Sequence, residues 1–195
     1  MSKRTLQQDF FKSRKAHGKR PDKFGGAKRT TRASRKARPI STTKSMHLVL
    51  KSLKAVGAWS FLTPANKKLI KELLTKYASY FGVQILSYAN VGNHLHIHLK
   101  ARSHLGFKSF VRAFTGTLAL KITGASKINK LKEKFWTQVP YTRFVHGLID
   151  HLRLKDYFEI NEIEGFGLPR AKAEYFVETQ ARTREWFRKR LIELG

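Results

Sequence analysis

The sequence predicts an α+β fold in which helices cover one face of an antiparallel sheet and leave the other face free. Two observations support this prediction. Segments with the periodicity of strands and helices follow one another in the order strand, helix, strand, strand, helix, strand, helix. Hydrophobic residues make up 41% of the 195 residues, which is enough for the core of a single domain.

The first strand is predicted at residues 46–52, where polar and apolar side chains alternate and His47 falls on the face opposite to the leucines. Thr63-Pro64 is typical of a helix start, because threonine caps the free N–H groups and proline suits the first helical position. Apolar residues then recur at helical spacing until Gly82, which ends the first helix.

The next two strands, 83–89 and 93–99, are separated by the tight turn 90–92 and therefore predict a hairpin. Apolar residues at helical spacing predict a second helix over 107–122. Residues 136–145 are predicted to be extended and, because they include a proline, to form an edge strand.

A third helix is predicted over 148–163, and a basic amphipathic helix is predicted after Pro169. The chain is therefore divided into a basic arm at 1–45, a central domain at 46–168 and a C-terminal helix at 169–195. The arm carries fifteen lysines and arginines against two aspartates, and it has too few aliphatic residues to offset the entropy of folding. We expect it to be disordered.

The net charge of +27 favours a polyanionic partner, and nucleic acid is the first expectation. No apolar run approaches the roughly 20 residues that span a bilayer, so a membrane partner is not expected. The absence of cysteine excludes disulfides and thiolate metal sites. The arginine- and serine-rich start also fits an organellar transit peptide, which stays open as an alternative.

Three histidines alternate with three aliphatic residues in the last strand of the hairpin. In a strand, His94, His96 and His98 point to one face, and the aliphatic residues between them point to the other. The aliphatic face can join a core, whereas two imidazoles at positions i and i+2 form a ready pair of ligands for a divalent metal. The asparagine at 93 favours His94 with His96, although His96 with His98 is a rival pair.

The third helix offers a further ligand and a nucleophile. Tyr157 and Asn161 lie at i and i+4 and so share one face of the helix. If that helix crosses the histidine face, the Asn161 amide oxygen can bind the metal and the Tyr157 hydroxyl can attack a metal-bound phosphate. Tyr141 and Tyr175 are competing tyrosines in basic surroundings, but neither has an asparagine at i+4.

These motifs resemble those of the single-tyrosine HUH transposases, in particular the REP-associated tyrosine transposases. That family carries Asn-His-hydrophobic-His on a central strand, here residues 93–96, and tyrosine, three residues, then asparagine on a later helix, here 157–161. The opening strand at 46–49, the helix segment 110–116 and the pair 135–136 also resemble the family. The resemblance covers about residues 44–168.

The resemblance implies a ferredoxin-like fold with Tyr157 as nucleophile and His94, His96 and Asn161 as ligands of Mg²⁺ or Mn²⁺. It implies a transposase that cleaves and rejoins single-stranded DNA beside a hairpin through a 5′-phosphotyrosine. Such a protein would act as a monomer or homodimer in the bacterial cytoplasm, associated with the nucleoid. Glu162 stands where the family usually has proline, and His98 where it usually has an aliphatic residue, which suggests a divergent or domesticated member.

Five basic residues of the central domain are expected to contact DNA phosphates: Lys108, Arg112, Lys121, Arg143 and Arg153. Two other functions remain open at this point. A non-catalytic binder of RNA or DNA would need neither the tyrosine nor the histidines. A zinc hydrolase would use His94, His96 and a distant acid, although acidic residues are scarce near these positions.

Overall fold

The computed structural model of the chain describes residues 23–26, 39–126 and 128–180. Within these residues, five antiparallel strands form one sheet in the order β1-β5-β2-β4-β3. The strands are β1 (Lys23–Gly26), β2 (Met46–Lys51), β3 (Val83–Asn90), β4 (His94–Ala101) and β5 (Val139–Phe144). The helices are α2 (Pro64–Tyr80), α3 (His104–Thr123) and α4 (Gly147–Gly165), with a short 3-10 turn, η1 (Gly57–Trp59).

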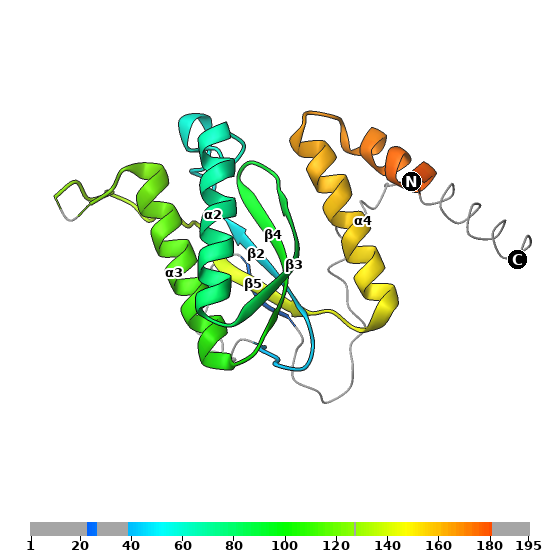
Figure 1. Cartoon of the computed structure of the whole chain (residues 1–195). Helices are drawn as coiled ribbons and strands as arrows, with labels where there is room; N and C mark the ends of the chain where they lie inside the picture. Colours follow the sequence, from blue (N-terminus) through cyan, green and yellow to red (C-terminus); the bar gives the residue numbers. More distant parts are fainter. Residues whose placement is uncertain (1–22, 27–38, 127, 181–195) are drawn as a thin grey trace, which may run out of the picture.

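Helices lie on both sides of this sheet (Figure 1). The helices α2 and α3 lie side by side on one face, and α4 crosses the other. From β2 to β5 the elements follow the order strand, helix, strand, strand, helix, strand, and the sheet order places β2 at its centre between β5 and β4. The prediction of a ferredoxin-like α+β fold, with histidines on the face away from α2 and α3, is confirmed.

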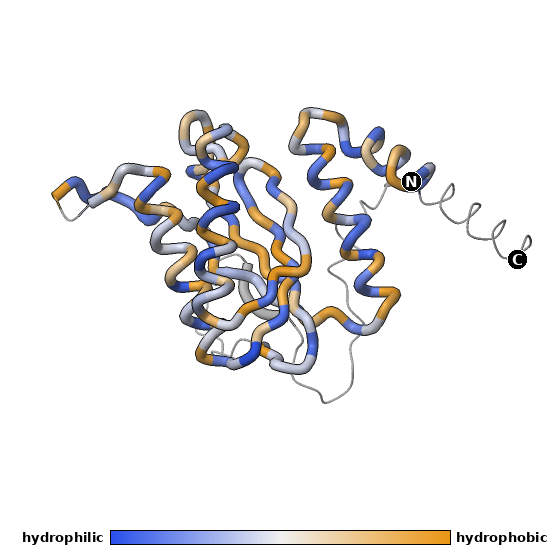
Figure 2. The backbone as a smooth tube through the Cα atoms, in the orientation of Figure 1, coloured by the Kyte–Doolittle hydropathy of each residue, from blue (hydrophilic) through white to orange (hydrophobic). Residues whose placement is uncertain are grey.

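The main core lies between the sheet and the pair α2–α3. Apolar and polar residues alternate along the helices at the spacing that lets one stripe be buried, as Figure 2 shows. Thr63 caps α2 by accepting a hydrogen bond from the Asn66 N–H, and Pro64 begins the helix as predicted. The fully buried side chains of this core include Leu48, Leu95, Ile97, Leu99, Phe107, Phe110 and Phe114.

The strand β1 differs from the prediction of disorder over 1–45. Lys23 pairs with Arg143 and Phe24 with Thr142, so β5 is not an edge strand. Backbone pairing needs no apolar side chains, and an exposed strand edge offers unpaired N–H and C=O groups to any nearby segment. The register shifts between Phe24 and Gly26, opposite Pro140, which has no N–H to donate. The rest of the arm up to residue 38 lies outside the described residues.

The C-terminal helix begins after Pro169, as predicted, and the structure describes it over residues 170–180. Its buried residues Ala173 and Val177 pack against Ile160 of α4. Residues 181–195 lie outside the described part. No helix in the described ranges combines the length and apolar character needed to cross a membrane.

Candidate active site

The alternation along β4 determines which side chains reach the face under α4. Leu95, Ile97 and Leu99 are buried in the core with α2 and α3, so the three histidines must point to the opposite face. There they lie beneath α4, where His96 is only 2% exposed. The central strand β2 adds His47, whose direct cross-strand neighbour is His98.

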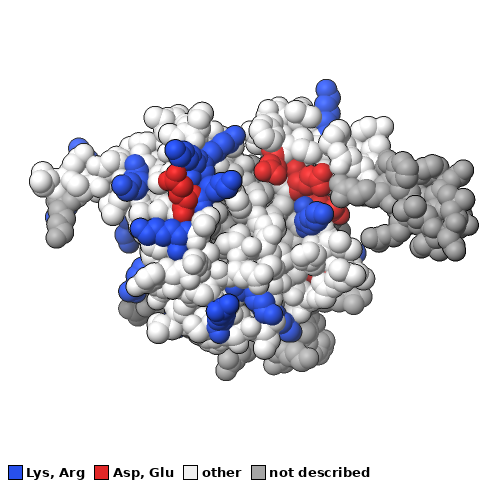
Figure 3. All heavy atoms as spheres, viewed as in Figure 1, with Lys and Arg blue, Asp and Glu red and all other residues white. Residues whose placement is uncertain are grey.

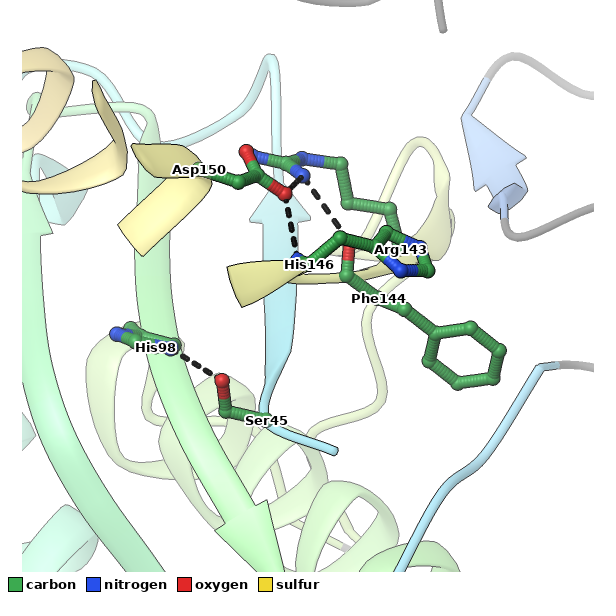
Figure 4. A network of polar contacts seen from close by, with 6 residues as sticks. All are labelled: Ser45, His98, Arg143, Phe144, His146 and Asp150. Atoms are coloured by element: carbon green, nitrogen blue, oxygen red, sulfur yellow. Dashed lines mark hydrogen bonds and ion pairs between the residues drawn. The ribbon is translucent and has the colours of Figure 1, made fainter. Parts of the chain in front are cut away.

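The start of α4 is fixed to the sheet by a buried ion pair, shown in Figure 4. Arg143 of β5 donates two hydrogen bonds to Asp150, of 2.8 and 3.0 Å, and a third to the Phe144 carbonyl. The Asp150 carboxylate also accepts from the His146 N–H at 2.8 Å. Burial alone would raise the pKa of Asp150, but the bonds from Arg143 and His146 lower it below its usual value.

The far end of α4 is held by a close approach to the β3–β4 turn. A Cβ on Gly165 would stand 2.9 Å from the Asn90 carbonyl oxygen, so only glycine allows this distance. Between the two ends, Leu154 and Phe158 pack with Ala89 and Val145. As a result, α4 contacts the sheet at both ends and along its length as it crosses the histidine face.

This position brings Tyr157 against the imidazoles. Its ring centroid lies 5.1 Å from that of His96, edge to face at 90°, and 6.2 Å from that of His47. The side chain is 4% exposed. Burial raises the pKa of the Tyr157 phenol, while the Asn161 side chain and the positive charge of Arg170 partly oppose this shift.

Asn161 lies one turn further along α4 and is equally buried. Its amide nitrogen donates to the Tyr157 backbone carbonyl at 2.5 Å. Since the amide nitrogen is only a donor, the amide oxygen is the atom that can bind a cation. Tyr157 on α4 thus faces His96 on β4, His94 neighbours His96 on the strand, and Asn161 lies one turn from Tyr157 on the helix.

The side chains present here suit a divalent cation. The Nε2 atom of His96 is buried, and no hydrogen-bond partner for it is found within the described residues. His94 bonds Asn93 through Nδ1 at 2.6 Å, and the ring centroids of His94 and His96 are 4.7 Å apart. Burial lowers the pKa of His94 to about 4 and also lowers that of His96, so both rings are neutral and carry a lone pair at neutral pH.

The possible ligand atoms are imidazole nitrogens and an amide oxygen rather than carboxylate oxygens. Over the described ranges, no group of three or more His, Asp or Glu side chains is placed to hold a metal. The site could therefore hold a cation with two imidazoles, the Asn161 amide oxygen and atoms of the substrate. Such a set differs from the three charged or imidazole ligands of most zinc hydrolases.

The rival histidine pair is less suited to a cation. The Nε2 atom of His98 bonds the Ser45 hydroxyl at 2.9 Å, as Figure 4 shows, and its ring lies 5.1 Å from that of His151. The His98 ring therefore contacts Ser45 and His151 rather than Tyr157. Among the competing tyrosines, Tyr175 is 73% exposed on the C-terminal helix.

The predicted DNA-binding residues are spread over different faces. Lys108, Arg112 and Lys121 are exposed on α3, across the sheet from Tyr157, and Arg153 is exposed on α4. Arg143 corrects the prediction, because it is 6% exposed and bonded to Asp150 rather than available to a phosphate.

Figure 3 shows lysines and arginines gathered over α2, whereas acidic residues gather near α4. Close to the site, Arg170 forms ion pairs with Glu164 and Glu174. Its guanidinium carbon Cζ lies 6.0 Å from the centroid of the Tyr157 ring.

Sequence reasoning missed His47 and Arg170 as neighbours of the site. The alternation along β2 could have identified His47, since it shares the face of the histidine row. No comparable signal marks Arg170, because its position depends on how the C-terminal helix turns back on α4.

The same part of the chain is similar in sequence to a known protein family. The profile of the family described as "Transposase IS200 like" matches residues 45–160, which is more than half of the chain. No curated protein matches the chain.

Two solved structures are similar to parts of the chain. One is a REP-associated tyrosine transposase bound to a REP hairpin, with 15% identity over 68% of this chain and 74% of that one, at a TM-score of 0.49. The other is a candidate transposase from Deinococcus radiodurans R1, with 18% identity over 66% of this chain and 98% of that one, at a TM-score of 0.40.

Proposed function

Because the chain belongs to the family of IS200-like transposases, we propose that it cleaves and rejoins single-stranded DNA through a covalent bond to Tyr157. One observation supports this proposal above all. The phenol ring of Tyr157 packs edge-on against His96, with Asn161 one turn away on the same helix. The proposed nucleophile thus lies against one potential ligand of a Mg²⁺ or Mn²⁺ ion, and the two other proposed ligands, His94 and Asn161, lie on the same strand and helix.

The chemistry that these residues support is a transfer of one phosphodiester bond. The Tyr157 Oη atom gives its proton to solvent and attacks phosphorus, the bond to the 3′ oxygen breaks, that oxygen takes up a proton to become a 3′-hydroxyl, and the 5′ end stays on the tyrosine. A cation held by His94, His96 and Asn161 would neutralise charge on a non-bridging phosphate oxygen. A 3′-hydroxyl that attacks the phosphotyrosine reverses the step, so rejoining needs no nucleotide cofactor.

The burial of Tyr157 explains why the substrate must be flexible. A phosphate can reach the phenol only after the segments that cover it move, and a shift of α4 from the sheet would also uncover His96, which lies beneath that ring. The opening therefore exposes nucleophile and ligands together. A single strand can enter such a gap and present a phosphate in line with its leaving oxygen, whereas a stiff duplex cannot.

The partner proposed here is single-stranded DNA beside a hairpin. The net charge of +27 supports a nucleic-acid partner. Exposed Lys108, Arg112 and Lys121 offer phosphate contacts on α3, and Arg153 offers one on α4. The protein would act as a monomer or homodimer on the DNA of the bacterial nucleoid.

The proposal is tested by trapping the covalent intermediate. The full chain is incubated with Mn²⁺ and a pool of 5′- and 3′-labelled single strands, each with a hairpin and randomised flanks. We expect an adduct that survives denaturation, is lost in Tyr157→Phe and persists in the matched control Tyr175→Phe. Binding without any adduct would point to a non-catalytic nucleic-acid binder. Cleavage that survives Tyr157→Phe would point to a hydrolase.

A further inference from the structure

A second buried histidine contacts the candidate metal ligand His96. His47 of β2 is fully buried, and its Nε2 atom lies 3.0 Å from Nδ1 of His96. The two ring centroids are 5.2 Å apart, with 30° between the ring planes. The strand register pairs His47 directly with His98, so its ring leans along the sheet to reach His96 diagonally.

A hydrogen bond between two ring nitrogens has only two arrangements, because one proton lies between them. If His47 donates, Nδ1 of His96 uses its lone pair to accept, and the His96 proton sits on Nε2, where it blocks metal binding. If His96 donates from Nδ1, its Nε2 carries the free lone pair that a cation requires. The partner of His96 thus selects which nitrogen can bind.

We propose that His47 is a positioning residue that accepts the Nδ1–H of His96 and so directs the His96 Nε2 lone pair into the site. This inference rests on the proposed metal dependence. Metal-binding histidines generally donate their second N–H to a fixed acceptor, which sets both tautomer and ring orientation. Here His47 is the acceptor, and both rings are too deeply buried for water to replace it.

The Nε2 atom of His96 supports this arrangement. It is buried and has no hydrogen-bond partner within the described residues. A lone pair at this atom can receive a cation, whereas a proton there would block it. His98 offers a contrast, because it lies on the same face with similar burial but bonds Ser45 instead of His96.

The test compares three variants of the full chain. His47→Gln places a side-chain oxygen near the position of Nε2 and keeps an acceptor, whereas His47→Leu removes it. His98→Leu is the matched control, since it deletes a buried imidazole on the same face whose Nε2 atom bonds Ser45 rather than His96. Mn²⁺ affinity is measured by calorimetric titration, and ¹⁵N NMR of labelled histidine reports the His96 tautomer without metal.

We expect His96 to be protonated at Nδ1 in the unchanged protein and in His47→Gln. We expect His47→Leu to weaken Mn²⁺ binding by about 10- to 100-fold. The affinities of His47→Gln and His98→Leu should stay close to that of the unchanged protein. The NMR measurement on the unchanged protein decides the matter even if His47→Leu fails to fold.

Three results would overturn the inference: a proton on Nε2 of His96 in the unchanged protein, unaltered Mn²⁺ affinity in a folded His47→Leu, or an equal loss in His98→Leu. These would leave the proposed function intact. Failure of the unchanged protein to bind Mn²⁺ would instead refute metal dependence, and with it this role of His47.

Discussion

The buried ion pair between Arg143 and Asp150 carries the first prediction. The substitution Asp150→Asn removes the negative charge while keeping one acceptor oxygen. It removes the Asp150 charge from the buried Arg143 guanidinium and weakens the bond to the His146 N–H. Because this pair fixes the first turn of α4, the change should loosen the helix that carries Tyr157.

The cost follows from the burial of the two side chains. The Arg143 side chain is 7% exposed and that of Asp150 is 24% exposed. Removing one partner of a fully buried pair costs about 3–5 kcal/mol, whereas exposed pairs are worth about 0–1 kcal/mol. Since the arginine is buried and the aspartate only partly so, we expect a loss of about 2–4 kcal/mol in the free energy of unfolding.

Urea unfolding followed by circular dichroism measures this loss. Asp156→Asn is the matched control, because it removes the same charge from α4, and Asp156 forms no ion pair within residues 39–126 and 128–180. The double variant Arg143→Met with Asp150→Asn should be less destabilised than the sum of its parts, since no unpaired charge remains. A loss under about 1 kcal/mol in Asp150→Asn, or strict additivity in the double variant, would refute the assigned role.

Three further predictions concern the site and its supports. Gly165→Ala should destabilise the protein by about 1–3 kcal/mol in urea unfolding, because the added Cβ would meet the Asn90 carbonyl. In the control Gly116→Ala, on α3, the added Cβ would meet no other atom, so this variant should be more stable than the unchanged protein. Equal effects of the two substitutions would contradict this prediction. The pKa of His94 is lowered to about 4 in the folded protein. As the pH falls, the unfolded chain therefore takes up a proton on this histidine before the folded protein does, so without metal the free energy of unfolding should fall between about pH 6.5 and pH 4. A smaller fall in His94→Gln checks the assignment. Mn²⁺ at about 100 times its dissociation constant should raise the free energy of unfolding of the unchanged protein by about 2.7 kcal/mol. It should not stabilise His96→Ala. Equal stabilisation of the two proteins would exclude His96 as a ligand of the ion.

The sequence predicts much of the site because strand alternation has strong structural consequences. Once Leu95 and Ile97 are assigned to the core, His94 and His96 must share the opposite face. The i, i+4 spacing likewise places Tyr157 and Asn161 on one face of α4 without knowledge of the fold. Only the crossing of α4 over the sheet, which brings the helix residues to the histidine face, depended on the family resemblance.

Other features depend on contacts that local patterns do not contain. Arg143 looks like a surface charge on an edge strand, yet Asp150, from the start of the next helix, draws it into a buried pair. The bond between His47 and His96 depends on the register of two strands that are far apart in the chain. The pairing of β1 with β5 joins two segments that are far apart in the chain, and composition gives no sign of it.

The most direct test of the whole account is to identify the residue that holds the DNA. The adduct formed with the labelled strands is digested with protease and nuclease, and its peptides are sequenced by mass spectrometry. We predict a nucleotide joined through its 5′ phosphate to the oxygen of Tyr157. Attachment to another residue, or cut strands with no nucleotide on any peptide, would contradict the role assigned to that tyrosine.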